Sequence, residues 1–211
     1  MTGKAGGATL ARRSGPVAGV VLAAGQSRRL GSNKLLFEID GETLVHRAVA
    51  RAVEAGLDPV LVVVGHDRER VEAAISGLPC RSVYNPRFAE DGRDGSLRAG
   101  LQALPDDAAG AMVILADMPR VESWMLAALA DAFRSGSAPL VASRYAEVHA
   151  PPMVFDRSLF HELHALEGRR VVRAHLPAAD VLAWPEKALR DLDVPADADA
   201  LGVRGLEDSQ L

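Results

Sequence analysis

The chain has 211 residues, of which 48% are hydrophobic, and this is enough for one domain of moderate size with its own core. The formal net charge of −4 argues against a nucleic-acid partner or an anionic membrane surface, and no apolar run approaches the roughly 20 residues of a membrane span. The single cysteine, Cys80, excludes an internal disulfide framework and a cysteine-rich metal site. We therefore expect a cytoplasmic protein with no nucleic-acid or membrane partner.

Predicted strands and helices alternate from residue 17 to residue 143. Apolar, β-branched runs predict buried strands at 17–22, 59–64, 80–84, 111–116 and 140–143. Apolar stripes at helical spacing predict helices at 43–55, 68–76, 97–104 and 124–133. The polar, glycine-bearing segment 85–95 is predicted to be a loop. This alternation predicts a doubly wound, mostly parallel α/β sheet with helices on both faces.

The last third of the chain changes character and predicts a small C-terminal β/α addition to the sheet. A short strand at 153–155 leads to Asp156 as a helix N-cap and to a helix at 159–166. Two further strand candidates lie at 181–184 and 189–192. No linker divides the chain, so we expect a disordered lead-in at 1–15, one domain at 16–204 and a tail at 205–211.

The most informative stretch runs from Leu22 to Lys34 and has the sequence L-A-A-G-Q-S-R-R-L-G-S-N-K. A buried strand here enters a loop of small residues that contains Gly25 and is followed by Arg29 and Lys34. Small residues let a polyanion approach the backbone N–H groups and the cations neutralise it, so this is the outline of a phosphate site. The stretch matches neither the P-loop pattern nor G-x-G-x-x-G. Gly25 alone would be an ordinary turn residue, so the prediction depends on the whole stretch.

Asp117 is the second informative position, because it directly follows the predicted strand that ends at Ala116 and precedes Met118-Pro119. Ligands of doubly wound sheets bind beyond the carboxyl ends of the strands. A carboxylate at this place can hold Mg²⁺, which usually takes one or two carboxylates together with phosphate oxygens. An isolated Asp-x-Pro is more often a turn, but beside a phosphate site the metal interpretation is favoured.

The two motifs resemble those of the molybdopterin guanylyl- and cytidylyl-transferase type of nucleotidyltransferase. They are most similar to the molybdenum cofactor cytidylyltransferases, which have L-A-A-G at the turn, as Leu22–Gly25 does, and N-K-L-L after it, as Asn33–Leu36 does. Guanylyl members usually have a second glycine where Ala24 stands. The resemblance implies a sheet of the nucleotide-diphospho-sugar transferase (Rossmann-like) type.

The resemblance also implies a role for individual residues. The nucleotide-binding residues would be Leu22, Ala23, Ala24, Gly25, Ser27, Arg29, Lys34, Gly92 and Ser96. The catalytic residues would be Arg29, Lys34 and Asp117, with Mg²⁺ as cofactor on Asp117. A second metal ligand, Asp193, is suggested by Arg190–Pro195, which is similar to a late D-x-D-x-P in the family; this aspartate is equally well explained as a turn residue.

The implied reaction is transfer of a cytidylyl group from CTP to the terminal phosphate of molybdopterin or molybdenum cofactor, with release of pyrophosphate. A molybdenum hydroxylase would then receive the product. The chain departs from the family at Arg93 and Asp94, where small residues are more common, at His149–Pro151 and at Gly168–Val171, where the family has G-D-x-G. The last two departures leave the acceptor open more than the nucleotide.

Three alternatives therefore stay open. The protein could transfer a nucleotidyl group from another nucleoside triphosphate or to another phosphorylated acceptor. It could be an NAD(P)H-dependent reductase of the nicotine-blue type on the same fold, although the missing G-x-G-x-x-G speaks against a dinucleotide. It could also be a chaperone that carries the cofactor without chemistry.

Overall fold

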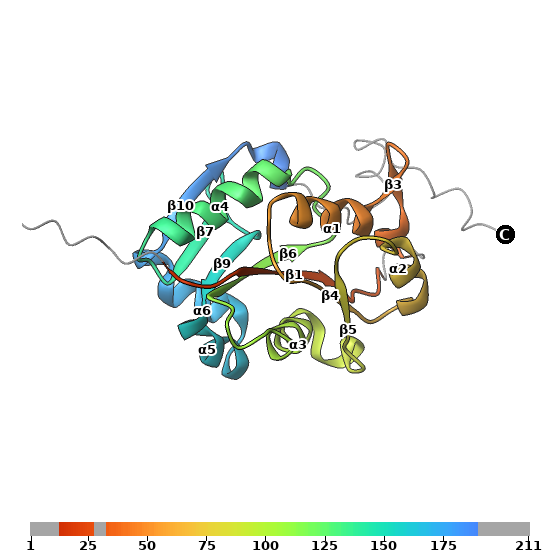
Figure 1. Ribbon diagram of the computed structural model, residues 1–211, viewed down its shortest axis with the longest axis horizontal. Helices are drawn as coiled ribbons and strands as arrows, with labels where there is room; N and C mark the ends of the chain where they lie inside the picture. The colour runs from red at the N-terminus through yellow and green to blue at the C-terminus, as the bar shows by residue number, and fades with distance from the viewer. Residues whose placement is uncertain (1–12, 28–32, 190–211) are drawn as a thin grey trace, which may run out of the picture.

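The computed structural model describes residues 13–27 and 33–189, which are built around one mixed sheet (Figure 1). Its strands are β1 (Val17–Ala23), β4 (Val60–Val64), β5 (Arg81–Tyr84), β6 (Gly110–Leu115), β7 (Leu140–Tyr145), β8 (Val148–His149), β9 (Met153–Asp156) and β10 (Asp180–Trp184). They are ordered β10-β7-β9-β6-β1-β4-β5, and β8 pairs with β7. Only β8 and β9 are antiparallel to their neighbours in this described sheet. The predicted mostly parallel sheet is therefore confirmed.

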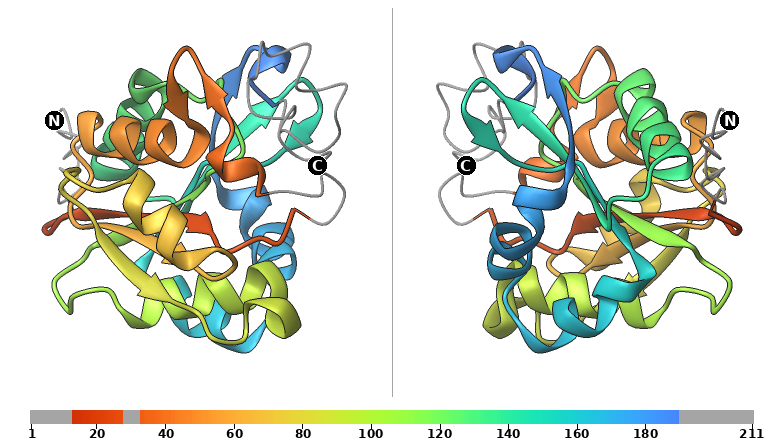
Figure 2. Two further views of the ribbon diagram at one scale, coloured as in Figure 1. Left: turned by 90° about the vertical axis from the view of Figure 1, so that its right-hand side faces the viewer. Right: turned by 90° about the vertical axis from the view of Figure 1, so that its left-hand side faces the viewer.

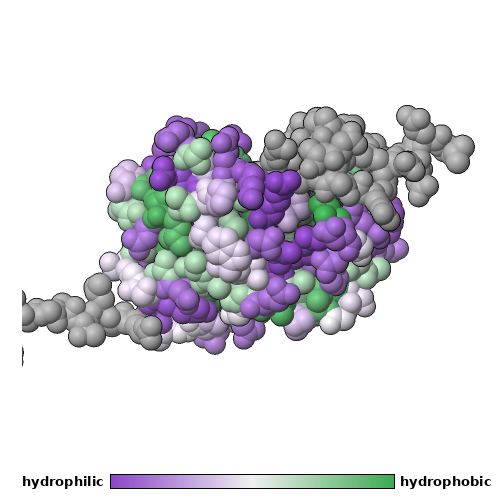
Figure 3. Space-filling model, turned by 90° about the horizontal axis from the view of Figure 1, so that it is seen from above, coloured by the Kyte–Doolittle hydropathy of each residue, from purple (hydrophilic) through white to green (hydrophobic). Residues whose placement is uncertain are grey.

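Helices cover both faces of the sheet (Figures 1 and 2). They are α1 (Leu44–Glu54), α2 (Arg68–Ala74), α3 (Phe88–Gln102), α4 (Ser123–Ser135), α5 (Phe160–Ala165) and α6 (Gly168–His175). Buried residues of α1, α2 and α4 belong to one apolar cluster, and those of α3, α5 and α6 belong to the other. In Figure 3, which views the molecule from above, many of the residues drawn in colour are hydrophilic, as expected for the outer faces of amphipathic helices.

The strands in the middle of the sheet are apolar at successive positions because each face is covered. All five residues of β4 are buried, and they alternate between the two clusters: Val62 and Val64 pack on one side and Val63 on the other. Val20 and Val21 of β1 divide in the same way. Fully burying one such side chain is worth roughly 1.5–3 kcal/mol, so the central strands are strongly held in place.

The register of the strands places two sequence-distant segments side by side. Leu22 of β1 pairs with Leu115 of β6, and Ala23 pairs with Val64 of β4. Because β1, β4 and β6 are parallel, the residues that follow them leave the sheet at the same edge. The turn after Ala23 and the segment after Leu115 are therefore neighbours, although about ninety residues separate them in the chain.

The prediction of a loop at 85–95 is wrong, because α3 begins at Phe88. The polar composition misled the prediction: Arg87 forms ion pairs with Glu90 and Asp91 across the first turn of this helix. Gly92 has φ 58° and ψ −146°, so it interrupts α3 with a kink. Gly95 permits the kink, since a Cβ there would lie 2.1 Å from the Asp91 Cβ.

Two predictions near the C-terminus have mixed outcomes. Asp156 is a cap, as predicted, and its side chain accepts a hydrogen bond from the Ser158 N–H at 2.9 Å at the start of the 3-10 helix η2 (Arg157–Leu159). The sequence predicted a strand at 189–192. Its first residue, Leu189, instead ends the 3-10 helix η4 (Glu186–Leu189). The rest of that segment lies outside the described residues. Most of the expected lead-in and all of the expected tail also lie outside them.

Arg13, at the start of the described chain, makes several contacts with distant segments. Its Nε lies 2.8 Å from a carboxylate oxygen of Asp156, and its guanidinium donates to the carbonyls of Gly136 and Ala138 at 3.0 and 2.8 Å. The guanidinium also lies over the Phe133 ring, 4.1 Å from its centroid. These contacts join the residues before β1 to α4 and β9.

None of the helices that the structure describes has the length and apolar character of a membrane span.

The pKa of Asp156 is lowered: burial alone would raise this pKa, but hydrogen bonds from Ser158 and the charge of Arg13 outweigh the burial. A carboxyl whose pKa is lower in the folded state adds stability above its unfolded pKa and loses it as the pH falls through the folded pKa. We expect Asp156→Asn to lower the free energy of unfolding by about 1 kcal/mol at pH 7, with a smaller difference at pH 3. Urea denaturation at both pH values measures this. Asp131→Asn, which removes the carboxylate of the exposed pair with Arg134, is the control and should have little effect. An equal loss at both pH values would contradict the assignment.

Candidate functional site

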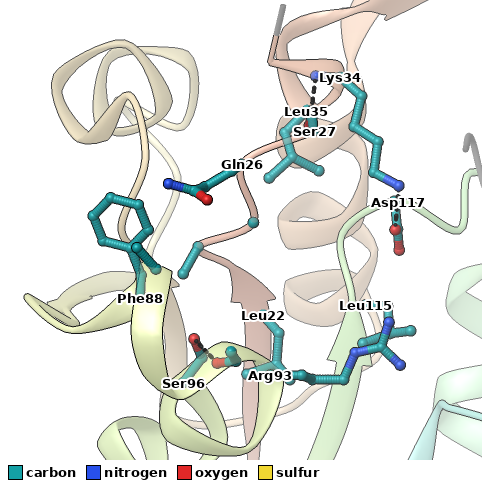
Figure 4. Close-up of a pocket in the computed structure, with 14 residues that line it drawn as sticks. Leu22, Gln26, Ser27, Lys34, Leu35, Phe88, Arg93, Ser96, Leu115 and Asp117 are labelled. Atoms are coloured by element: carbon teal, nitrogen blue, oxygen red, sulfur yellow. Dashed lines mark hydrogen bonds and ion pairs between the residues drawn. The ribbon is translucent and has the colours of Figure 1, made fainter. Parts of the chain in front are cut away.

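A cleft of about 380 Å³ lies at the carboxyl ends of β1 and β6 (Figure 4). Three segments line it: the turn after β1 with the 3-10 helix η1 (Lys34–Leu36), the first turns of α3, and the end of β6 with Asp117. Leu22 and Leu115, which are register partners, both contribute to its lining. Since these segments are far apart in the sequence, the cleft exists only in the folded chain.

Most of the residues predicted from the sequence lie in this cleft. They are Leu22, Ala24, Gly25, Ser27, Lys34, Gly92, Ser96 and Asp117. Ala23 is not among the lining residues, because its side chain points into the core below and is 1% exposed. Arg29 and Asp193 lie outside the described residues, so their predicted roles remain predictions.

Hydrogen bonds hold the described residues on either side of 28–32 in place. Ser27 has a positive φ of 47°, and its Oγ accepts a hydrogen bond from the backbone N–H of Lys34 at 3.1 Å. Asn33, which is 2% exposed, caps η1 by accepting from the Leu35 N–H at 3.1 Å. Leu35 is buried, so both neighbours of Lys34 are anchored. The backbone that carries Lys34 is therefore held in place beside the cleft.

Lys34 and Asp117 form an ion pair in the cleft. The Lys34 Nζ lies 2.7 Å from the Asp117 Oδ2, and the two side chains are only 14% and 15% exposed. Low exposure strengthens such a pair, because water screens it less. The ion pair links the turn after β1 to the end of β6. Asp117 is the acidic side chain that lines the described part of the cleft.

The opposite wall is organised by Asn85, which the sequence analysis did not single out. Its Nδ2 donates to the Ser96 Oγ at 3.2 Å, and its Oδ1 accepts from the Arg87 N–H at 3.0 Å. The Ser96 hydroxyl in turn donates to the carbonyl of Gly92 at 3.1 Å. Asn85 and Ser96 are both buried. An asparagine directly after a predicted strand and before a helix was the signal that could have identified this position.

Six further lining residues were missed as site residues: Gln26, Leu35, Phe88, Ala89, Arg93 and Leu115. Phe88 lies on the wall formed by α3 (Figure 4) and packs closely on Gly65. A Cβ on Gly65 would lie 2.6 Å from the Phe88 Cβ and 2.9 Å from the Ala24 Cβ. Because Gly65 has no side chain, Phe88 can lie close to the turn after β1.

Asp117 fits a divalent cation that also binds phosphate oxygens. Among the residues that the structure describes, no group of three or more His, Cys, Asp or Glu side chains is placed to hold a metal. Mg²⁺ needs only one or two carboxylates when phosphates complete its shell. The lysine already beside Asp117 shows that a positive charge is accommodated there. The donor set is thus suited to a metal that arrives with a polyphosphate.

Two curated proteins are similar to most of this chain. The chain is 34% identical to the bifunctional protein GlmU of Anaeromyxobacter dehalogenans, over 91% of this chain and 45% of that one, so it spans about half the length of this curated relative. It is 30% identical to the purine catabolism protein PucB of Bacillus subtilis, over 89% of this chain and 96% of PucB.

Among solved structures, Rv0371c of Mycobacterium tuberculosis superposes with a TM-score of 0.76 and 28% identity, covering 89% of this chain and 98% of that one. A complex of Rv0371c with manganese superposes with a TM-score of 0.70, 27% identity and the same coverage. The family model of the MobA-like NTP transferase domain matches residues 19–182. This match spans most of β1, the whole described cleft and most of β10, and it confirms the resemblance seen in the sequence motifs at the level of the family. The chain therefore belongs to the family of MobA-like NTP transferase domains.

Proposed function

We propose that the protein transfers a cytidylyl group from CTP to a phosphorylated acceptor, with release of pyrophosphate, and that the acceptor is molybdopterin or molybdenum cofactor. The observation that carries the proposal is the meeting of Lys34 and Asp117, 2.7 Å apart, beside the glycine turn that follows β1. A cation for phosphates and a carboxylate for a metal are the two groups that nucleotidyl transfer needs most. The family match supports the same reaction class.

In this proposal the triphosphate lies against residues 24–27. The backbone of the turn and Lys34 hold the phosphates, and Lys34 stabilises the charge that develops on the leaving pyrophosphate. Arg29 is assigned to the same task. Asp117, with Asp193 as a second ligand, would hold Mg²⁺, and the metal would supply charge neutralisation of the phosphates and a more electrophilic α-phosphorus. The manganese complex of Rv0371c supports a divalent cation in this family.

The acceptor needs no general base. The second pKa of a phosphate monoester is about 6, so the monoester is already anionic at neutral pH. An acceptor oxygen forms a bond to the α-phosphorus, the bond from that phosphorus to the bridging oxygen breaks, and pyrophosphate leaves with the electron pair. No histidine lines the described part of the cleft, which is consistent with catalysis by positioning and charge.

CTP is proposed as donor because Ala24 stands where guanylyl members of the family usually have a second glycine. Ala24 of the turn lies close to Gly65, since a Cβ on Gly65 would lie 2.9 Å from the Ala24 Cβ. Gly92, Ser96 and Phe88 border the space assigned to the base. The buried Asn85–Ser96 hydrogen bond keeps this wall rigid.

The first prediction concerns the nucleotide. With Mg²⁺ and molybdenum cofactor, the protein should release pyrophosphate from CTP faster than from GTP or ATP. Lys34→Ala should lower this rate by about 100-fold, since it removes a cation from the leaving group. A coupled phosphate assay measures the rate, and circular dichroism checks the fold. Lys187→Ala, on the exposed side of η4, is the matched control and should keep full activity. Faster release from GTP would overturn the interpretation of Ala24. Activity with CTP and a different phosphate monoester, but not with molybdenum cofactor, would change the acceptor alone.

The second prediction concerns two glycines: a substitution at one should change nucleotide affinity, and a substitution at the other should change the stability of the fold. A Cβ on Gly25 meets nothing within 4 Å, so Gly25→Ala should leave the melting temperature unchanged. If the triphosphate lies on this turn, the added methyl group keeps it from the backbone, and the dissociation constant for CTP should rise about tenfold. Gly65→Ala should instead lower stability by about 1–3 kcal/mol, because its Cβ overlaps with Phe88. Calorimetry measures both quantities. Unchanged CTP affinity in Gly25→Ala would place the phosphates elsewhere.

The third prediction concerns the ion pair. A divalent cation must compete with Lys34 for the Asp117 carboxylate, so Lys34→Gln should raise the affinity for Mn²⁺ in the absence of nucleotide, by about tenfold. Titration followed by electron paramagnetic resonance measures free Mn²⁺ directly. Lys187→Gln serves as the control. If Lys34→Gln binds Mn²⁺ no better than the unmodified protein, Asp117 is not the metal ligand.

A further inference from the structure

Arg93 is a second cation in the cleft, on the wall opposite to Lys34. It directly follows the kink at Gly92 and is one of the residues that line the cleft. In Figure 4 its side chain extends from α3 along the floor of the cleft, and its guanidinium lies next to Leu115. The kink turns α3 so that this arginine faces the cleft.

The charge of Arg93 is not offset by its neighbours. Glu90 and Asp91 of the same helix form ion pairs with Arg87, at 3.3 and 3.1 Å. Asp94 accepts a hydrogen bond from the backbone N–H of Gly168 at 3.0 Å, which holds the start of α6 against α3. Within the described chain, Arg93 forms no ion pair with a carboxylate. The three acids of α3 are thus engaged elsewhere and Asp117 pairs with Lys34, while Arg93 remains available to an anion in the cleft.

The position of Arg93 relative to Lys34 indicates which anion it meets. In phosphoryl transfer the attacking and the leaving oxygen lie roughly in line across the phosphorus. Pyrophosphate is assigned to Lys34 and the turn after β1, so the attacking group must approach from the other side. In the view of Figure 4, Asp117 lies between the Lys34 ammonium and the Arg93 guanidinium. In this arrangement the Arg93 guanidinium is at the end of the cleft away from the group assigned to pyrophosphate.

We propose that Arg93 binds the phosphate of the acceptor, a phosphate monoester, and holds it in line for attack; this inference rests on the proposed function. A doubly charged monoester must approach both the α-phosphate and the carboxylate of Asp117, which repel it. A guanidinium offsets this repulsion and can bind two phosphate oxygens in a planar fork. One acceptor oxygen then forms the new bond to the α-phosphorus, and the bond to the bridging oxygen breaks as pyrophosphate leaves. Arg93 thus selects acceptors that carry a phosphate, and it does not hold the nucleotide.

The test uses inorganic phosphate as the probe for the acceptor group. The full chain is loaded with Mg²⁺ and a CTP analogue whose α,β-bridging oxygen is replaced by carbon, and phosphate is titrated by calorimetry. Arg93→Gln should weaken phosphate binding about tenfold and leave the affinity for the CTP analogue within twofold. Arg93→Lys, which keeps the charge but loses the fork, should be intermediate. Arg98→Gln removes a charge from the same helix outside the cleft lining and is the matched control.

Two results would overturn the inference. If Arg93→Gln weakens binding of the CTP analogue and not of phosphate, the arginine belongs to the nucleotide site. If the loaded protein binds phosphate equally well with and without Arg93, or not at all, the acceptor phosphate lies elsewhere. Failure of the unmodified protein to bind any nucleoside triphosphate would instead refute the proposed function, so the two failures are distinguishable.

Discussion

The ion pair between Lys34 and Asp117 is the interaction on which the rest of the cleft depends. It connects the turn after β1 with the end of β6 at 2.7 Å, and both side chains are largely shielded from water. Neither partner could reach the other without the parallel pairing of β1 with β6, which brings Leu22 beside Leu115. The buried core under these strands thus keeps two opposite charges in contact, at the place where we propose that a polyphosphate and its metal bind.

The shape of the cleft depends on the absence of side chains as much as on their presence. Gly65 allows Phe88 to lie against the turn after β1, and Gly92 breaks α3 so that Arg93 faces inward. Gly25 is open to the cleft and has no neighbour that would meet a side chain. The first two glycines are explained by the fold, whereas nothing in the described structure excludes a side chain at Gly25. The open space at Gly25 supports the proposal that the phosphates lie on this turn.

The two ends of the cleft differ in whether their cation is paired with an acid. Lys34 is neutralised by Asp117, so a triphosphate and a divalent cation can exchange with a pair of matching charges. Arg93 forms no ion pair with a carboxylate of the described residues, so the charge at its end of the cleft is not compensated. An anionic donor and an anionic acceptor can meet only if their repulsion is offset on both sides of the reacting phosphorus. In the proposed reaction, Lys34 and Arg93 would meet this requirement from two sides.

The mostly parallel sheet, the turn after β1 and the place of Asp117 at the end of β6 were predictable from the residues alone, because apolar periodicity and short motifs are local properties of a chain. The roles of Lys34 and Asp117 stay predictions. The loop expected at 85–95 was wrong since ion pairs of Arg87 and the kink at Gly92 stabilise a broken helix there. Phe88, Asn85 and Arg93 became visible as site residues only in the folded chain. Their roles depend on distances between α3, β1 and β6, and such distances are set by the packing of the sheet and its two cores, which no local pattern encodes.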